Sequence, residues 1–226
     1  MGVTYHADLI QGSDEWLAAR CGLLTASEMK LILTPTLKVA NNDKTRAHMW
    51  ELLAQRITGY VEPHYVSDDM LRGQEDEWEA RRLYGEHFAP VETTGFITND
   101  KWGFTLGYSP DGLVGDHGLI ECKSRRQKFQ IQTIAAGDVP DDFWMQVQTG
   151  LLVSEREWLD FVSYSGGLPM FVMRVEPDEH TQGAIIEAAA EFEARLADAE
   201  NDYRGALAAM PKLIPTERRV EQEMFV

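Results

Sequence analysis

Residues 108–123 read Tyr-Ser-Pro-Asp-Gly-Leu-Val-Gly-Asp-His-Gly-Leu-Ile-Glu-Cys-Lys, and the structure that we expect for the chain is built around this segment. Pro110 and Gly112 predict a sharp turn that presents Asp111 at the end of a strand. The apolar runs after that turn, split by Asp-His-Gly, predict a hairpin that ends at Lys123.

The hairpin brings together side chains of one chemical kind. Residues two apart in a strand share a face, so Glu121 and Lys123 point the same way, and Cys122 points into the opposite, packed face. The hairpin also folds Asp111 back beside them. The sequence therefore predicts two carboxylates and a lysine on one surface.

Such a group suits a Mg²⁺ ion that acts on phosphodiester bonds, because Mg²⁺ prefers oxygen ligands and keeps several waters. Lys123 can orient or deprotonate a water, or neutralise charge that builds on the phosphate. The alternative is a surface turn followed by a strand whose Glu-x-Lys pair faces solvent. The same pattern occurs at Glu28-Met-Lys30, but in an expected helix, where residues two apart do not share a face.

The rest of the chain predicts an α/β protein in which helices flank a central mixed β-sheet. Ser13 can cap a short helix, and Thr25-Ala-Ser-Glu28 is a capping box that opens a second one. Further helices are expected at 43–58, 69–88, 141–153 and 178–210, and strands at 91–98, 101–108, 112–115, 118–123, 158–164 and 170–176. No repeat or linker divides the chain, so we expect residues 1–226 to form one domain with a long C-terminal helix.

The composition bounds the class of protein. The net charge of −16 argues against a protein that coats nucleic acid through bulk charge, although it does not exclude a local grip on DNA. Cys21 and Cys122 form no CxxC pair and are expected to be reduced thiols. No secretory signal and no apolar run near the roughly 20 residues that span a bilayer is visible, which favours a cytoplasmic protein without a membrane partner.

Several ordered motifs resemble one family. The Pro-Asp…Glu-x-Lys arrangement resembles the PD-(D/E)xK nuclease superfamily. The flanking motifs resemble the phage lambda exonuclease and YqaJ-like viral recombinase family: Arg20-Cys-Gly-Leu-Leu-Thr-Ala-Ser-Glu28, Leu52-Leu-Ala-Gln-Arg-Ile-Thr-Gly59, Gly73-Gln-Glu-Asp-Glu-Trp-Glu-Ala-Arg81, Ser109-Pro-Asp-Gly112 and Phe143-Trp-Met-Gln-Val-Gln148. The resemblance runs from about residue 12 to 153 and implies a restriction-endonuclease-like core.

The resemblance also implies roles for the residues of the metal site. Asp111 and Glu121 would bind the ion together with the backbone carbonyl of Cys122, and Lys123 would serve the nucleophilic water. Glu77 would bind or orient a second ion, although a solvated acidic helix face is the alternative. Gln146 matches the family's active-site glutamine, and its alternative is a polar residue on an amphipathic helix.

A second implied site holds the 5′-phosphate of the substrate strand. Arg20, Ser27 and Ser109 match this pocket, and an arginine fork and a helix N-terminus both suit phosphate. The alternatives are a surface charge for Arg20 and a second capping group for Ser27. Met70, with Leu71 next to it, falls where the family inserts an apolar wedge into the end base pair, but a buried residue at a helix start is equally compatible with the sequence.

We therefore expect a Mg²⁺-dependent 5′-to-3′ exonuclease that acts on double-stranded DNA ends in the recombination system of a phage or prophage, with Mn²⁺ able to replace Mg²⁺. It would release mononucleotides and leave 3′ single-stranded tails for a single-strand annealing recombinase in the bacterial host's cytoplasm. The resemblance implies a homotrimeric ring around the DNA. The alternatives are a structure-specific or single-strand nuclease on the same fold, and a non-catalytic scaffold that binds DNA ends.

Overall fold

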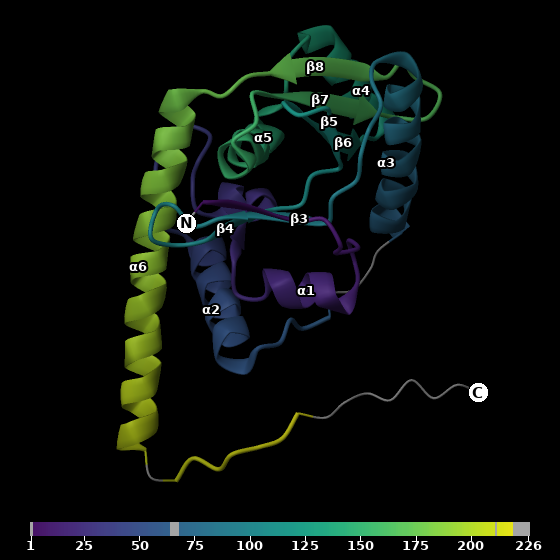
Figure 1. The fold of residues 1–226 in the computed structure, drawn as a ribbon. Coiled ribbons are helices and arrows are strands. Elements are labelled where there is room, and N and C mark those ends of the chain that lie inside the picture. Colours follow the sequence, from purple (N-terminus) through teal and green to yellow (C-terminus); the bar gives the residue numbers. More distant parts are fainter. Residues whose placement is uncertain (1, 64–67, 211, 219–226) are drawn as a thin grey trace, which may run out of the picture.

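The computed structural model describes residues 2–63, 68–210 and 212–218 and contains two sheets with helices around and between them (Figure 1). In chain order the elements are β1 (Val3–His6), α1 (Asp14–Arg20), β2 (Leu24–Thr25), the 3-10 helix η1 (Ala26–Leu31), α2 (Asp43–Thr58), α3 (Asp68–His87), β3 (Phe96–Asn99), β4 (Leu106–Tyr108), β5 (Gly112–Val114), β6 (Gly118–Ser124), α4 (Gln127–Ala136), α5 (Asp141–Ser154), β7 (Trp158–Tyr164), β8 (Phe171–Val175) and α6 (Glu179–Ala209).

The strands divide between two four-stranded sheets, with the orders β1-β3-β4-β2 and β5-β6-β7-β8. Each sheet is mixed, because β2 pairs parallel to β4 and β6 pairs parallel to β7, whereas the other neighbours are antiparallel. The predicted α/β class with mixed pairing is confirmed, but the single central sheet that we expected is replaced by two mixed sheets. The chain changes sheet at Ser109-Pro-Asp111, where Pro110 has no N–H to continue a ladder.

Helix α5 lies between the two sheets (Figure 1) and contacts β3, β4, β7, η1 and α6. Its residues from Val147 to Ser154 are all buried, so this half of the helix has no solvated face, as expected for a helix inside a core. Helix α3 covers β6 and β7, and α6 runs along α2 and α5. The result places β6, the strand with the candidate chemistry, between α3 and the interior.

Most predicted elements are present, but the first two predicted strands are shorter. The expected strand 91–98 reduces to β3, with only an isolated bridge between Glu92 and Leu113 before it, and 101–108 reduces to β4. The capping box forms, since Glu28 accepts from both the N–H and the hydroxyl of Thr25, but it opens a 3-10 helix.

Three elements have no counterpart in the sequence prediction, namely β1, the two-residue strand β2 and α4. Strand β1 is short and pairs only with β3, so its pattern is weak. Helix α4 buries Gln130 and Thr133 and exposes Ile131, so its apolar residues do not mark its inner face. The long last helix matches its prediction, with Asp178 as the N-cap and buried residues as far as Ala199. Among the described helices, none combines the length and apolar character needed to cross a membrane.

Candidate active site

The β5–β6 hairpin forms as predicted and sets the position of Asp111. Strand β5 pairs with β6 from Val114↔Gly118 to Gly112↔Ile120, so the pairing ends one residue before Glu121. Asp111 precedes β5, and its Oδ2 accepts a 2.5 Å hydrogen bond from the backbone N–H of Cys122. This bond fixes Asp111 against the edge of β6 between Glu121 and Lys123.

Glu121 is buried and receives three side-chain hydrogen bonds. The Tyr108 hydroxyl donates to Oε2 over 2.7 Å, Lys123 Nζ donates to Oε1 over 2.7 Å, and the Gln146 amide also donates to Oε1. Burial raises the pKa of Glu121 to about 7, against the lowering effect of Lys123. The structure therefore brings together Glu121, Lys123 and Gln146, three of the predicted residues.

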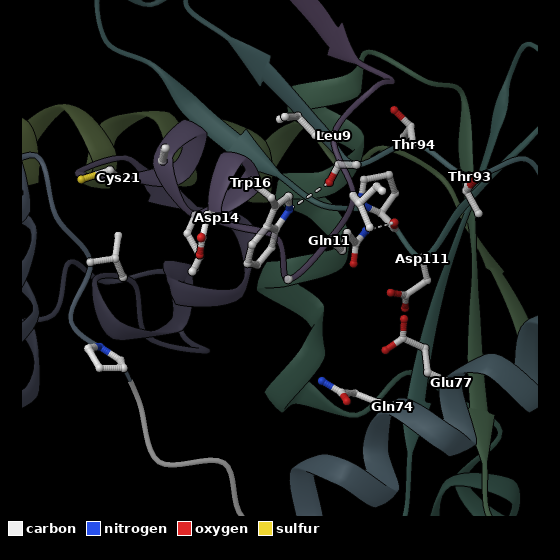
Figure 2. A pocket seen from close by; sticks show the side chains of 18 of the residues that line it. Leu9, Gln11, Asp14, Trp16, Cys21, Gln74, Glu77, Thr93, Thr94 and Asp111 are labelled. Carbon is white, nitrogen blue, oxygen red and sulfur yellow. Dashed lines mark hydrogen bonds between the residues drawn. The ribbon is translucent and has the colours of Figure 1, made fainter. Parts of the chain in front are cut away.

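Glu77 reaches the same place from α3. Its carboxylate and that of Asp111 point toward each other across the cleft (Figure 2). Burial, followed by the charge of Glu77, raises the pKa of Asp111 well above its ordinary value. The acid-rich first half of α3 is thus not only a solvated face, because Glu77 faces a second carboxylate.

Lys123 is the cation of this acidic group. Burial lowers the pKa of Lys123, but the carboxylates of Glu121, Asp111 and Glu77 outweigh burial and hold it above its ordinary value. A protonated lysine donates hydrogen bonds and does not accept a proton. This arrangement supports two of the roles expected for Lys123, which are to orient a water by donating a hydrogen bond and to neutralise charge on the phosphate.

The residues fit a divalent cation with few protein ligands. Two carboxylates that face each other in a buried setting repel, and a cation between them removes that repulsion. Mg²⁺ is commonly held by one or two carboxylates, with waters and substrate phosphate completing the shell. Within the described residues, no three His, Cys, Asp or Glu side chains form a ready-made cation cage, since Glu121 is turned toward Tyr108, Lys123 and Gln146. Asp111 and Glu77 are the pair best placed to hold the ion.

The three residues predicted to hold a phosphate lie together around Arg20 at the end of α1. Its guanidinium donates to the Ser109 hydroxyl over 3.1 Å and to the Thr25 hydroxyl over 3.3 Å. Thr25 in turn lies 3.3 Å from the exposed Ser27 hydroxyl. Arg20, Ser27 and Ser109 are thereby linked. Burial lowers the pKa of Arg20, and the charge of Glu28 opposes this effect.

A cleft of about 1250 Å³ runs from α1 past Asp111 and Glu77 to the start of α3. Met70 lines this cleft and is 50% exposed, as is Leu71, which is not among the lining residues. The alternative interpretation of the sequence, a buried residue at the start of a helix, therefore fits neither Met70 nor Leu71. Met70 is placed to touch a substrate in the cleft, whereas nothing in the lining supports Leu71.

Three residues of the site were not singled out from the sequence. Trp16, which lines the cleft (Figure 2), donates from Nε1 to the Ser109 hydroxyl over 3.0 Å and to the Gly95 carbonyl over 3.1 Å. The guanidinium carbon of Arg20 lies 4.3 Å from the centroid of the Trp16 ring. Arg81 donates to the Asp111 carbonyl over 3.3 Å, and Tyr108 binds Glu121. The signal for Trp16 was its position four residues before Arg20 on one helix face.

Comparisons with known proteins show the family and the fold of the chain. The sequence model of the YqaJ-like viral recombinase domain matches residues 15–157. The alkaline exonuclease LHK-Exo from Laribacter hongkongensis is 33% identical, with a TM-score of 0.76 over 87% of this chain and 99% of that one. The structure of LHK-Exo in complex with dAMP gives 34% identity and a TM-score of 0.78 over the same shares of the two chains.

A phage related exonuclease from Haemophilus somnus 129PT shares the fold at 14% identity, with a TM-score of 0.52 over 78% of this chain and 96% of that one. No curated protein matches the chain. The architecture is therefore that of the nuclease fold with a restriction-endonuclease-like core. The chain belongs to the YqaJ-like viral recombinase family.

Proposed function

We propose that the chain is a phage-type exonuclease that degrades double-stranded DNA from its 5′ ends, with Mg²⁺ as cofactor and mononucleotides as products. The observation that carries the proposal is the spacing between two sites. Ser109 belongs to the Arg20 pocket and Asp111 to the carboxylate site, and the two residues are separated only by Pro110. Two residues of extended chain span roughly 6–7 Å, which suits the step from a terminal phosphate to the next phosphodiester.

This spacing favours removal of one nucleotide at a time from a phosphorylated end. A terminal phosphate held by Arg20 and Ser109 places the next phosphodiester beside Asp111, so hydrolysis there releases a 5′-mononucleotide. The dAMP complex of LHK-Exo is in keeping with such a product. A site that required no end would have no use for a phosphate pocket so close to the carboxylates.

Each side chain around the scissile phosphate would have a separate role. Asp111 and Glu77, with the backbone carbonyl of Cys122, would hold the ion, and Glu121 would join them or position Lys123. Mg²⁺, when bound, would polarise the phosphate and supply an activated water. Lys123 would neutralise charge on the phosphate, and Gln146 would hold the carboxylate of Glu121. Met70 would contact the end base pair from the cleft wall.

We further propose that three copies form a ring around the duplex and deliver 3′ single strands to an annealing recombinase in the cytoplasm of a bacterial host. Support for the ring comes from the resemblance and from the net charge of −16, because a ring holds an acidic protein on DNA without bulk attraction. Light scattering tests it: a mass near 25.6 kDa, that of one chain, would remove the ring.

The function is tested by the release of nucleotides from matched DNA substrates. Linear duplexes with 5′-phosphate or 5′-hydroxyl ends, closed circles and single strands are incubated with Mg²⁺ or with a chelator, and Lys123→Ala is the inactive control. We expect linear duplexes with 5′-phosphates to be degraded to mononucleotides and closed circles to survive. Cleavage of circles, or faster degradation of single strands, would favour a different nuclease, and binding of ends without hydrolysis would favour a scaffold.

A further inference from the structure

A second, smaller pocket lies at the far end of β6 from the hairpin turn. It has a volume of about 400 Å³ and is lined mainly by Arg72 of α3, Arg125 and Arg126 of the β6–α4 connection, and Ser165 of the β7–β8 loop. We call it the arginine pocket. Three guanidinium groups on one small cavity are notable in a chain with a net charge of −16.

The arginine pocket adjoins the candidate active site through one aromatic ring. Lys123 Nζ lies 5.5 Å from the centroid of the Phe143 ring, and the Arg125 guanidinium carbon lies 5.1 Å from the same centroid. Arg125 continues the line of β6, since its N–H donates to the Tyr164 carbonyl over 2.7 Å. Residues two apart in a strand share a face. Lys123 and Arg125 are therefore successive cations on one side of the same strand.

Arg125 lacks a complete set of partners. Its Nε is buried and has no hydrogen-bond partner among the described residues. The guanidinium carbon lies 5.1 Å from the ring centroid of Phe129 and 5.1 Å from that of Phe143, so two aromatic rings contact it. Burial lowers the pKa of Arg125, and Asp142 opposes this effect. A guanidinium that is held in place but not fully hydrogen-bonded is suited to bind a phosphate oxygen.

Arginines outnumber acidic residues in the lining of the arginine pocket. Asp76 lines it but accepts a hydrogen bond from Ser124 Oγ and lies 3.8 Å from Arg72 Nε. Helix α4 begins at the pocket, and its first turn contains no acidic residue. Among the described residues, the lining of the pocket thus contains three arginines and one acidic residue, Asp76.

From these observations we infer that the arginine pocket binds a backbone phosphodiester of the DNA substrate, next to the scissile bond and on the side away from the Arg20 pocket. The inference rests on the proposed function and adds a second anchor to it. The Arg20 pocket holds the end, Lys123 faces the bond to be cut, and Arg125 holds a phosphate further along. Such a contact adds affinity without reading sequence.

The test separates binding from hydrolysis. Lys123→Ala serves as the parent, and Arg125→Gln and Arg125→Lys are added to it, with Arg204→Gln, a surface arginine paired with Glu200, as the matched control. Binding to a linear duplex is measured as a function of salt. We expect Arg125→Gln to weaken binding roughly tenfold, as for loss of one charge-assisted hydrogen bond, and to lower the salt slope by about 0.9, as for loss of one B-DNA phosphate contact.

Duplexes that carry one uncharged methylphosphonate at successive positions then locate the contact. We expect one position to weaken the parent and to leave Arg125→Gln unaffected, which is the coupling that a direct contact requires. Arg125→Lys should restore the salt slope but not the full affinity. Circular dichroism of each variant shows that the fold is kept, and Arg126→Gln replaces Arg125→Gln if that variant unfolds.

The outcomes are distinct from those of the proposed function. No release of nucleotides by the unaltered chain would overturn the proposed function. Equal salt slopes and equal methylphosphonate profiles in parent and Arg125→Gln would overturn the arginine pocket alone. Inorganic phosphate provides the last comparison, with Tm as the measurement. The pocket binds a free anion and not DNA if phosphate raises the Tm of the parent but not that of Arg125→Gln, while the two proteins bind DNA equally well.

Discussion

Arg20 and Ser109 lie 89 residues apart in the sequence, yet the guanidinium of one donates a 3.1 Å hydrogen bond to the hydroxyl of the other. The bond joins α1 to the short segment that carries Asp111. The group proposed to recognise a DNA end is thereby attached directly to the segment that positions the candidate metal site.

We predict that Arg20→Ala reduces the preference for 5′-phosphate over 5′-hydroxyl ends by roughly 10- to 100-fold, because charge-assisted hydrogen bonds to phosphate are lost. The measurement is kcat/KM on the two linear duplexes. Arg204→Ala is the control for removal of a surface arginine. An unchanged ratio would remove the phosphate pocket from the proposal.

Trp16→Phe tests a residue that acts through its neighbours. The variant keeps a ring beneath Arg20 but removes the Nε1 donor to Ser109 and to the Gly95 carbonyl. We predict a smaller, roughly 2- to 10-fold reduction in the same preference, as for one neutral hydrogen bond. Trp16→Ala should reduce it further, and equal effects of the two variants would assign the role to the ring alone.

Glu77 and Glu79 provide a matched pair on α3. Glu77 faces Asp111, whereas Glu79 binds Arg82 on the outer side of the helix. We predict that Glu77→Gln lowers Mg²⁺-dependent kcat at least roughly 100-fold, a loss typical of removing one group that stabilises the transition state. Glu79→Gln should retain activity, and similar rates for both variants would contradict the assignment of Glu77.

The buried carboxyl of Glu121 predicts how stability depends on pH in metal-free buffer. Burial raises its pKa from about 4.5 to about 7, so the folded protein binds this proton more tightly than the unfolded chain does. The contribution to stability is therefore fully present below about pH 4.5 and is lost as the pH rises to about 7. Thermal unfolding with a chelator should show Tm falling across this window.

Glu121→Gln is the variant that isolates this contribution. It should flatten part of the decline in Tm, because the glutamine amide does not ionise. Mg²⁺ should raise Tm at neutral pH in the unaltered chain, since a ligand of the folded state stabilises it, and less so in the variant. A Tm that rises from pH 5 to pH 7 without metal would contradict the sign.

Replacing Asp160 should lower the stability of the fold at a position outside the candidate active site. This buried residue of β7 accepts a 2.6 Å hydrogen bond from the Tyr84 hydroxyl and two of 2.9 Å from Arg174. We predict that Asp160→Ala costs about 2–3 kcal/mol, at the low end for a broken buried pair because Arg174 is half-exposed. Urea unfolding measures this loss of unfolding free energy, and Asp198→Ala, at an exposed position, is the control. A smaller loss for Asp160→Ala than for Tyr84→Phe would contradict the role of the Asp160 carboxylate.

Local pattern was enough to predict much of the site. Alternation along β6 put Glu121 and Lys123 on one face and Cys122 on the other, and Pro110 and Gly112 marked the turn at Asp111. Hydrophobic periodicity and capping residues likewise predicted α2, α5 and α6, because caps and stripes are properties of a few neighbouring residues. The weak elements escaped: β1 is stabilised by its partner strand, and α4 buries polar side chains.

Local patterns in the sequence are enough to predict the α/β class, the hairpin and the types of residue that gather there. Tertiary packing separates the strands into two sheets, brings Glu77 to Asp111 and Trp16 to Ser109, and places Lys123 and Arg125 near the same Phe143 ring. These relationships join residues far apart in the chain. They depend on how α1, α3 and α5 pack on the sheets, and burial then sets the charge balance that a linear pattern does not contain.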